Sequence, residues 1–155
     1  MASTISNATL EVNISESLSL GGTQYGGTKT LSISGINEVF KRIVKCVASQ
    51  TTTIATFNGN AFASDNAIDL EDAKYIRVSN LSTTADIEIG VAGAASNYSM
   101  LIPAGNSHII SRADNVMLAE ADAVPTYGSL ADITKLEVRP TASTDVNVEI
   151  FVATV

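Results

Sequence analysis

The chain has 155 residues, of which 45% are hydrophobic, 16% are charged and 5% are aromatic, and its formal net charge is -7. This length suits one domain with an ordinary hydrophobic core. A single cysteine excludes a disulfide within the chain, a single histidine excludes most histidine-based metal sites, and the acidic balance disfavours a nucleic-acid binder.

The charged fraction is low beside the roughly 25% of an average globular protein, and Ala, Ser, Thr, Asn and Gly fill the deficit. A weakly charged surface of this kind loses little side-chain entropy when it is covered. The centres of protein interfaces are likewise depleted of charge. The composition therefore favours a protein that packs against neighbours. The alternative is a mildly hydrophobic monomer.

The first third of the chain predicts a hairpin. Apolar and polar residues alternate over 10–14 and 31–33, which indicates two strands, and Leu18 with Leu20 extends the first strand past a kink. Glycine pairs at 21–22 and 26–27 bracket a loop that contains Tyr25, and no Lys-Ser/Thr pair follows the last glycine directly, as a phosphate loop requires. We expect residues 1–35 to form an N-terminal arm or long hairpin that reaches a neighbouring subunit.

Residues 36–47 support two interpretations. Their apolar residues fall at helical spacing, which predicts a helix from Asn37 to Cys46. The same residues are β-branched and run into 51–57, a stretch typical of a strand. The family resemblance given below favours a strand from about Arg42 to Ala48, and we adopt the strand.

The remaining elements are short alternating strands separated by turns, with loops at 58–73 and 122–132. We expect an all-β fold in which residues 36–155 form one compact β-sandwich or jelly-roll-like domain, with about nine or ten short antiparallel strands in the whole chain. The further strands are expected at Lys74–Ser79, Asp86–Val91, Tyr98–Ile102, Ser107–Ile110, Val116–Leu118, Leu136–Val138 and Asp145–Val152.

Two residues could support nucleophilic or acid–base chemistry. His108 follows a turn on an apolar strand, and catalysis would need an orienting partner that the sequence does not reveal. Cys46 lies in an apolar run, where free cysteines are usually small buried hydrophobes, although Lys41, Arg42 and Lys45 could lower its pKa. We assign no catalytic residue and expect that the protein is not an enzyme.

An acidic cluster at Asp65, Asp69, Glu71 and Asp72 offers oxygen ligands for Ca²⁺. Its spacing is not that of an EF-hand, and the alternative is a solvated loop that keeps neighbours from adding to an edge strand. Both interpretations stay open at this point. We assign no metal-ligating residue and no cofactor.

Two other sets of residues could contact a partner. The basic cluster Lys41, Arg42 and Lys45 could touch an acidic neighbour, including another copy, or could simply be solvated. Without tryptophan, a carbohydrate-binding face would rely on tyrosines, which are Tyr25, Tyr75, Tyr98 and Tyr127.

No membrane segment is expected. The longest stretch without Asp, Glu, Lys or Arg runs from Ile89 to Ser111 and contains Pro103 and several polar residues, so it does not read as a membrane helix. The first ten residues lack the basic and apolar regions of a signal peptide.

Strand-and-turn patterns over most of 36–155 resemble small virion structural proteins of tailed bacteriophages, especially those of marine and cyanobacterial phages. These patterns are strand-and-turn motifs rather than an invariant signature. They lie at Ile36–Val39, Arg42–Val44, Thr51–Phe57, Lys74–Leu81, Ile87–Gly90, Leu101–Gly105 and Val146–Val152.

The resemblance implies a small β-sandwich on the virion, and it brings no catalytic residues. The expected function is capsid decoration, in which the protein binds and stabilises the head exterior through many contacts. The alternative is a tail, neck or fibre component that contacts host surface glycans. The implied partners are the major capsid protein or other virion proteins and further copies of the chain, with a trimer favoured. We expect no nucleic-acid or membrane partner.

Overall fold

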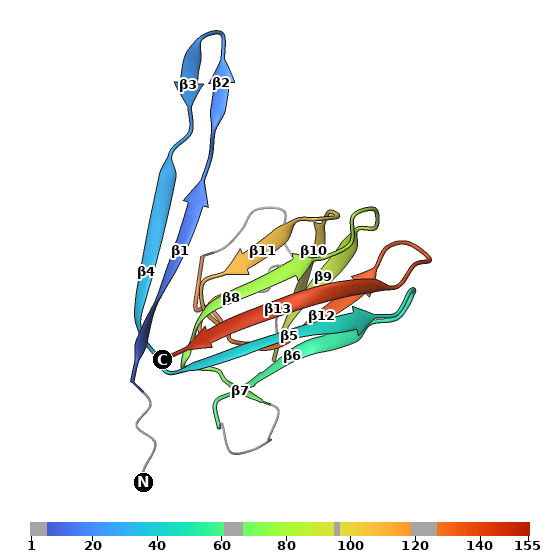
Figure 1. The fold of residues 1–155 in the computed structure, drawn as a ribbon. Helices are drawn as coiled ribbons and strands as arrows, with labels where there is room; N and C mark the ends of the chain where they lie inside the picture. The colour runs from blue at the N-terminus through green and yellow to red at the C-terminus, as the bar shows by residue number, and fades with distance from the viewer. Residues whose placement is uncertain (1–5, 61–66, 95–96, 119–126) are drawn as a thin grey trace.

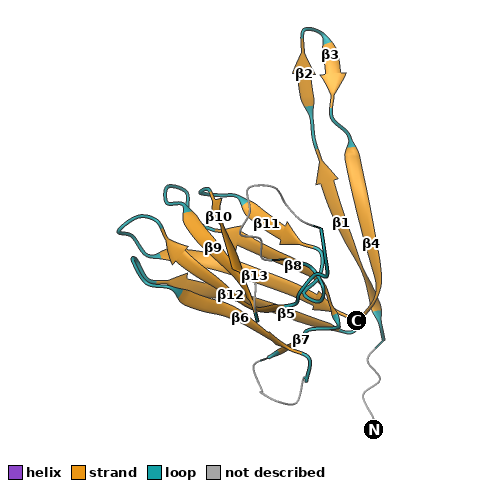
Figure 2. Cartoon of the chain, turned by 180° about the vertical axis from the view of Figure 1, so that it is seen from behind, coloured by secondary structure: helices purple, strands orange, loops and turns teal. Residues whose placement is uncertain are grey.

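A computed structural model of the chain describes residues 6–60, 67–94, 97–118 and 127–155. The fold is all-β, as expected, and these described parts of the chain contain no helix (Figures 1 and 2). The strands are β1 (Ala8–Ser15), β2 (Leu18–Leu20), β3 (Thr23–Tyr25), β4 (Thr28–Ile36), β5 (Glu38–Cys46), β6 (Thr52–Asn58), β7 (Ile68–Asp69), β8 (Ala73–Asn80), β9 (Ile87–Gly93), β10 (Asn97–Ile102), β11 (Ser107–Ile110), β12 (Ile133–Pro140) and β13 (Val146–Thr154).

The described residues thus hold thirteen strands, not nine or ten. The surplus includes β2, β3 and β7, which are two or three residues long and were expected within loops or as extensions of longer strands. The strand expected at 116–118 is instead one isolated bridge between Met117 and Ala131. Pairs as short as these leave almost no periodic signal in a sequence.

Two larger sheets form the part of the molecule that we call the body. One has the strand order β11-β8-β13-β5 and the other has the order β10-β9-β12-β6-β7. Side chains from both sheets meet in one hydrophobic cluster, which includes Ile76 and Ile150 from the first sheet and Ile54, Ile89 and Leu136 from the second. The two sheets therefore pack face to face around a single core.

Alternation along β13 decides how this strand is placed. Val146, Val148, Ile150 and Val152 are buried, while the residues between them face outward. Because side chains on a strand alternate between its two faces, a one-residue slip would expose this whole set. The sequence pattern and the observed register therefore agree.

The ambiguous segment is a strand, and the helical interpretation is wrong. β5 pairs with β13 along its entire length, from Cys46 opposite Val146 to Glu38 opposite Thr154. β5 begins at Glu38, before the expected Arg42, because β13 offers backbone partners as far as Thr154. The apolar residues mimicked a helical period because they lie on both faces of the strand: Val44 is partly buried, while Ile43 is exposed.

Residues 8–36 form a long hairpin that we call the arm, which projects from one end of the body (Figure 1). β1 pairs with β4, and β2 pairs with β3 at the tip. The arm leads directly into β5 through Asn37, whose N–H donates to the carbonyl of Thr154 at 3.1 Å. The left-handed backbone of Gly35, with φ of 84°, lies just before this bend. The described residues include no helix long and apolar enough to cross a membrane.

Candidate functional site

The arm has one apolar face and one polar face. Register places Leu10 opposite Ile33 and Val12 opposite Leu31, so these side chains share a face with Ile14. On the other face the Thr30 hydroxyl donates to Asn13 Oδ1 at 2.6 Å. An amphipathic hairpin of this kind needs a surface against which to bury its apolar side.

The body supplies such a surface for the base of the arm alone. Leu10, Val12 and Ile33 pack with Ile36 in a second hydrophobic cluster. The body contributes residues from β8 and β13 and the C-terminus to this cluster, namely Tyr75, Phe151, Ala153 and Val155. The Tyr75 and Phe151 rings meet edge to face, with centroids 6.0 Å apart.

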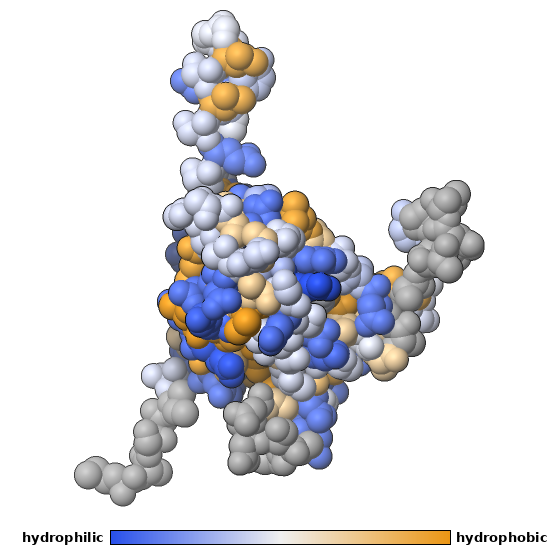
Figure 3. All heavy atoms as spheres, turned by 90° about the vertical axis from the view of Figure 1, so that its right-hand side faces the viewer, coloured by the Kyte–Doolittle hydropathy of each residue, from blue (hydrophilic) through white to orange (hydrophobic). Residues whose placement is uncertain are grey.

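Beyond this base, the apolar residues of the arm are exposed. Ile14 and Leu31 continue the packed face outward, and Leu18, Leu20 and Tyr25 follow at the tip. Leu20 is 66% exposed and Leu18 is 54% exposed. Figure 3 shows apolar atoms gathered at the tip of the arm, well away from the body. We call these five residues the distal stripe.

The outer face of the four-stranded sheet, on which the arm rests, carries a charge network. Glu149 on β13 accepts from Arg77 on β8 at 2.5 Å and pairs with Lys41 on β5 at 3.2 Å. Burial raises the pKa of Glu149, but the hydrogen bonds from Lys41 and Arg77 outweigh it, so the pKa lies below its ordinary value. The Arg77 guanidinium also lies 5.6 Å from the centre of the Phe151 ring.

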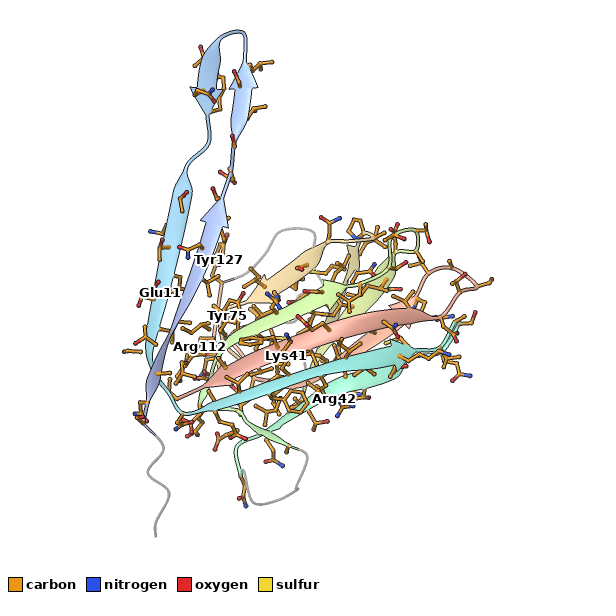
Figure 4. All side chains as sticks on the ribbon, viewed as in Figure 1. Glu11, Lys41, Arg42, Tyr75, Arg112 and Tyr127 are labelled. Atoms are coloured by element: carbon orange, nitrogen blue, oxygen red, sulfur yellow. The ribbon has the colours of Figure 1, made fainter. Side chains whose placement is uncertain are left out.

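The predicted basic cluster is divided between the two faces of β5. Lys41 and Lys45 face outward (Figure 4 labels Lys41), and Lys45 pairs with Asp145 at 2.8 Å, which raises the pKa of Lys45. Arg42 points to the other side, where its guanidinium lies 5.7 Å from the centre of the Phe40 ring. The outward lysines alternate with Val39 and Ile43, which are 50% and 61% exposed.

His108 and Cys46 do not form a catalytic pair. His108 lies on β11, opposite Val78 of β8. In the described part of the chain its ring forms no hydrogen bond with a side chain, and partial burial lowers its pKa. Cys46 is fully buried at the end of β5, and burial raises the pKa of its thiol. A thiolate nucleophile requires a lowered pKa and access to solvent.

The acidic cluster is not assembled as a metal site in the described residues. Asp69 Oδ1 accepts a hydrogen bond from the backbone N–H of Glu71 at 3.1 Å, so this carboxylate shapes a local turn. Across the described ranges, no three His, Cys, Asp or Glu side chains come together to hold a metal ion. Asp65 lies outside those ranges.

The four tyrosines do not share a groove. Tyr75 is buried at the base of the arm, whereas Tyr127 is almost fully exposed (Figure 4). Tyr25 lies at the tip of the arm and Tyr98 lies on β10, where burial raises its pKa. A stacking platform for a sugar requires aromatic rings that face the same ligand.

The outer face of the five-stranded sheet has a shallow trough centred on Gly90. Two adjoining hollows of about 220 Å³ and 470 Å³ share Gly90, Ser99 and Glu137 as lining residues. Glu137 is already engaged, because it accepts hydrogen bonds from Lys135 at 2.6 Å and from Thr53 at 3.5 Å. Among the described residues, no hydrogen bond joins the Ser99 hydroxyl to the Glu137 carboxylate, so the trough offers polar contacts without a hydrogen-bonded nucleophile and base.

No protein family, curated protein or solved structure matches the chain. Its functional assignment therefore rests on its own geometry and on the resemblance noted from the sequence. The distal stripe is the feature that the sequence analysis did not identify as a site. The sequence does show alternating apolar residues beside glycine pairs in this segment. The pattern could not show which of these apolar residues the body covers.

Proposed function

We propose that this chain is a structural protein of a bacteriophage virion, a decoration protein that binds and stabilises the exterior of the head. The distal stripe carries the proposal. A two-stranded hairpin that projects into solvent with five exposed large apolar residues is marginal alone and becomes stable when a partner covers it. This is the geometry of a docking element.

The proposal includes a jelly-roll topology for the body. Its pairing is nested: β5 pairs with β13, β6 with β12, β8 with β11 and β9 with β10. Rolling up one long hairpin so that its strands divide between two four-stranded sheets produces this nesting. The short parallel strand β7 is an addition at the edge beside β6.

The surface of the body supports assembly in many copies. A decoration protein gains avidity from repeated contacts, each of modest strength. The low fraction of charged residues keeps the desolvation cost of each contact small. The net charge of -7 suits a place on the exterior of the head and disfavours contact with packaged DNA.

We further propose that the partners are the major capsid protein or other virion proteins and further copies of this chain. No catalytic step is part of the proposal. The scattered tyrosines give the alternative, a glycan-binding tail or fibre component, no assembled aromatic site among the described residues.

The experiment is to locate the chain on purified phage particles by averaged electron-microscope density and antibody labelling. Hundreds of copies spread over the head support decoration. A few copies at the neck or tail would contradict it and would support the fibre alternative. Absence from the particles would contradict a virion function altogether.

A matched pair of variants then tests the arm. Particles that lack the chain are incubated with purified wild-type protein, with the double variant Leu18→Ser/Leu20→Ser, or with Ser32→Ala, which changes the polar face of the arm. We expect Ser32→Ala to bind like the wild type and the double variant to bind much less. Equal binding by all three proteins would contradict docking through the arm.

A further inference from the structure

We infer that the distal stripe of one copy packs on the outer face of β5 in a second copy of the same chain. This inference rests on the proposed function, because it names the partner of the same docking element. It assigns a self-association surface to residues that the body leaves uncovered. The site on β5 consists of Val39, Lys41, Ile43 and Lys45.

The first step is continuity with a contact that already exists. In each chain the base of the arm lies against Tyr75, Phe151 and Ala153 on the outer face of the four-stranded sheet. Ala153 pairs in register with both Tyr75 and Val39. The exposed apolar residues of β5 therefore begin beside the surface on which the base of the arm packs.

The second step is that both surfaces are apolar and exposed. Val39 and Ile43 are two residues of similar exposure, four positions apart on one strand face. The arm presents Leu18 and Leu20 on β2, near its tip, and these two residues are two positions apart. Each surface is a short apolar row on one face of a strand, and its residues are at least half exposed in their own chain.

Charge also favours this pairing. Glu16 lies between β1 and β2, and its carboxylate makes no ion pair with the described residues. Lys41 and Lys45 are more than half exposed although each has an intramolecular acid partner. Because an ammonium group has three N–H donors, each lysine can donate to a second carboxylate.

The tip of the arm lies away from this surface in its own chain. Figure 1 shows the arm rising away from the body from the point where β4 leads into β5, while β5 runs along the edge of the four-stranded sheet away from the tip, and Figure 2 shows the same arrangement from behind. When such a contact is head-to-tail rather than reciprocal between two copies, it closes into a ring if the rotation permits. A ring of this kind is compatible with a trimer.

Cysteine cross-linking tests the contact in the full chain. A Leu18→Cys protein is mixed with an Ile43→Cys protein of distinguishable mass under mild oxidation. The buried Cys46 serves as a silent background thiol in both proteins. The matched control replaces Ile43→Cys with Thr53→Cys, an exposed position on β6 in the other sheet.

We expect mixed disulfide dimers with Ile43→Cys and few with Thr53→Cys. Equal yields with both partners, or dimers formed mainly between two Leu18→Cys chains, would overturn the inference. Sedimentation gives a second readout without cysteines. We expect Leu18→Ser/Leu20→Ser and Ile43→Ser each to weaken self-association about tenfold or more, and Ser32→Ala to leave it unchanged. A wild-type chain that stays monomeric at all concentrations would also overturn the inference.

These outcomes are separate from those of the particle experiment. A chain that decorates phage heads but gives no arm-to-β5 cross-link keeps the proposed function and refutes this contact. A chain that forms the cross-link but is absent from particles keeps the contact and refutes the proposed function.

Discussion

Arg77 and Glu149 form a cross-strand ion pair in which the guanidinium Nη2 donates to Oε1 at 2.5 Å. The same guanidinium lies over the Phe151 ring, and Phe151 packs against Tyr75 beneath the base of the arm. The charge network and the apolar seat of the arm are therefore parts of one packed surface. We therefore expect a change in the ion pair to alter the packing where the base of the arm contacts Tyr75 and Phe151.

The ion pair predicts a loss of stability in acid. The pKa of Glu149 is lower in the folded chain than its ordinary value of 4.5, so the carboxylate contributes stability that is fully present above that value. This contribution is lost as pH falls below 4.5 through the folded pKa. We expect Glu149→Gln to lower the free energy of unfolding by about 1 kcal/mol at neutral pH, because solvent partly screens its partners.

Urea unfolding of wild type and Glu149→Gln at a series of pH values measures this effect. The two curves should converge as the pH drops below 4.5. Glu88→Gln, a change at an exposed carboxylate on β9, serves as the control and should shift stability by less than about 0.5 kcal/mol. A constant difference between wild type and Glu149→Gln at every pH would contradict the assignment.

A buried amide predicts a second stability effect. Asn80 is 2% exposed, and its Nδ2 donates to the carbonyls of Ala85 at 2.9 Å and Ile102 at 3.2 Å. Its Oδ1 accepts from the backbone N–H of Ser82 at 3.0 Å. Asn80→Ala leaves all three backbone groups without this partner, so we expect a loss of about 2–3 kcal/mol in chemical denaturation.

Asn106 provides the matched control for this prediction. It is exposed and its side chain makes a single hydrogen bond, from Nδ2 to the carbonyl of Ala104 at 3.1 Å. Asn106→Ala should cost about 0.5 kcal/mol or less. Similar losses for the two variants would show that the Asn80 network does not hold the β8–β9 turn.

Strands with alternating faces were predictable from the sequence. Val146 to Val152 alternate cleanly because one face of β13 contacts the core and the other faces outward, and local pattern then determines side-chain direction. β5 was not predictable in this way. Its outward face carries Val39 and Ile43, so burial did not impose alternation, and its strand conformation comes from pairing with the distant β13.

The candidate site depended on the same long-range contacts. The sequence indicated a hairpin around Leu10 and Leu31, but whether each residue is covered depends on Tyr75 and Phe151, which are far along the chain. The division of the basic cluster between two faces likewise followed from the strand. A helix would have placed Lys41, Arg42 and Lys45 together on one side.

Burial of Cys46 predicts a thiol that reacts slowly in the folded chain. The side chain has no exposed surface, and burial raises its pKa, so the reactive thiolate is scarce. We expect a colorimetric disulfide reagent to modify it at a rate that denaturant strongly accelerates. Ile43→Cys places a second thiol on the exposed face of the same strand and should react at once. Rapid modification of the wild-type thiol without denaturant would contradict the burial of this side chain.

Two adjacent glycines give a matched test of the arm. Gly26 has φ of 108°, and a Cβ at this position would lie 2.5 Å from the carbonyl oxygen of Glu16. Gly27 has open space around its Cα, and its carbonyl accepts the N–H of Glu16 at 2.8 Å, which a side chain leaves intact. Gly26→Ala should therefore separate the distal arm from its base, whereas Gly27→Ala should be tolerated. Limited proteolysis measures this difference: the Gly26→Ala chain should be cut within residues 16–27 many times faster than the Gly27→Ala chain, while the body stays resistant in both. Equal cleavage of the two variants would show that the close approach of Gly26 to Glu16 does not hold the tip in place.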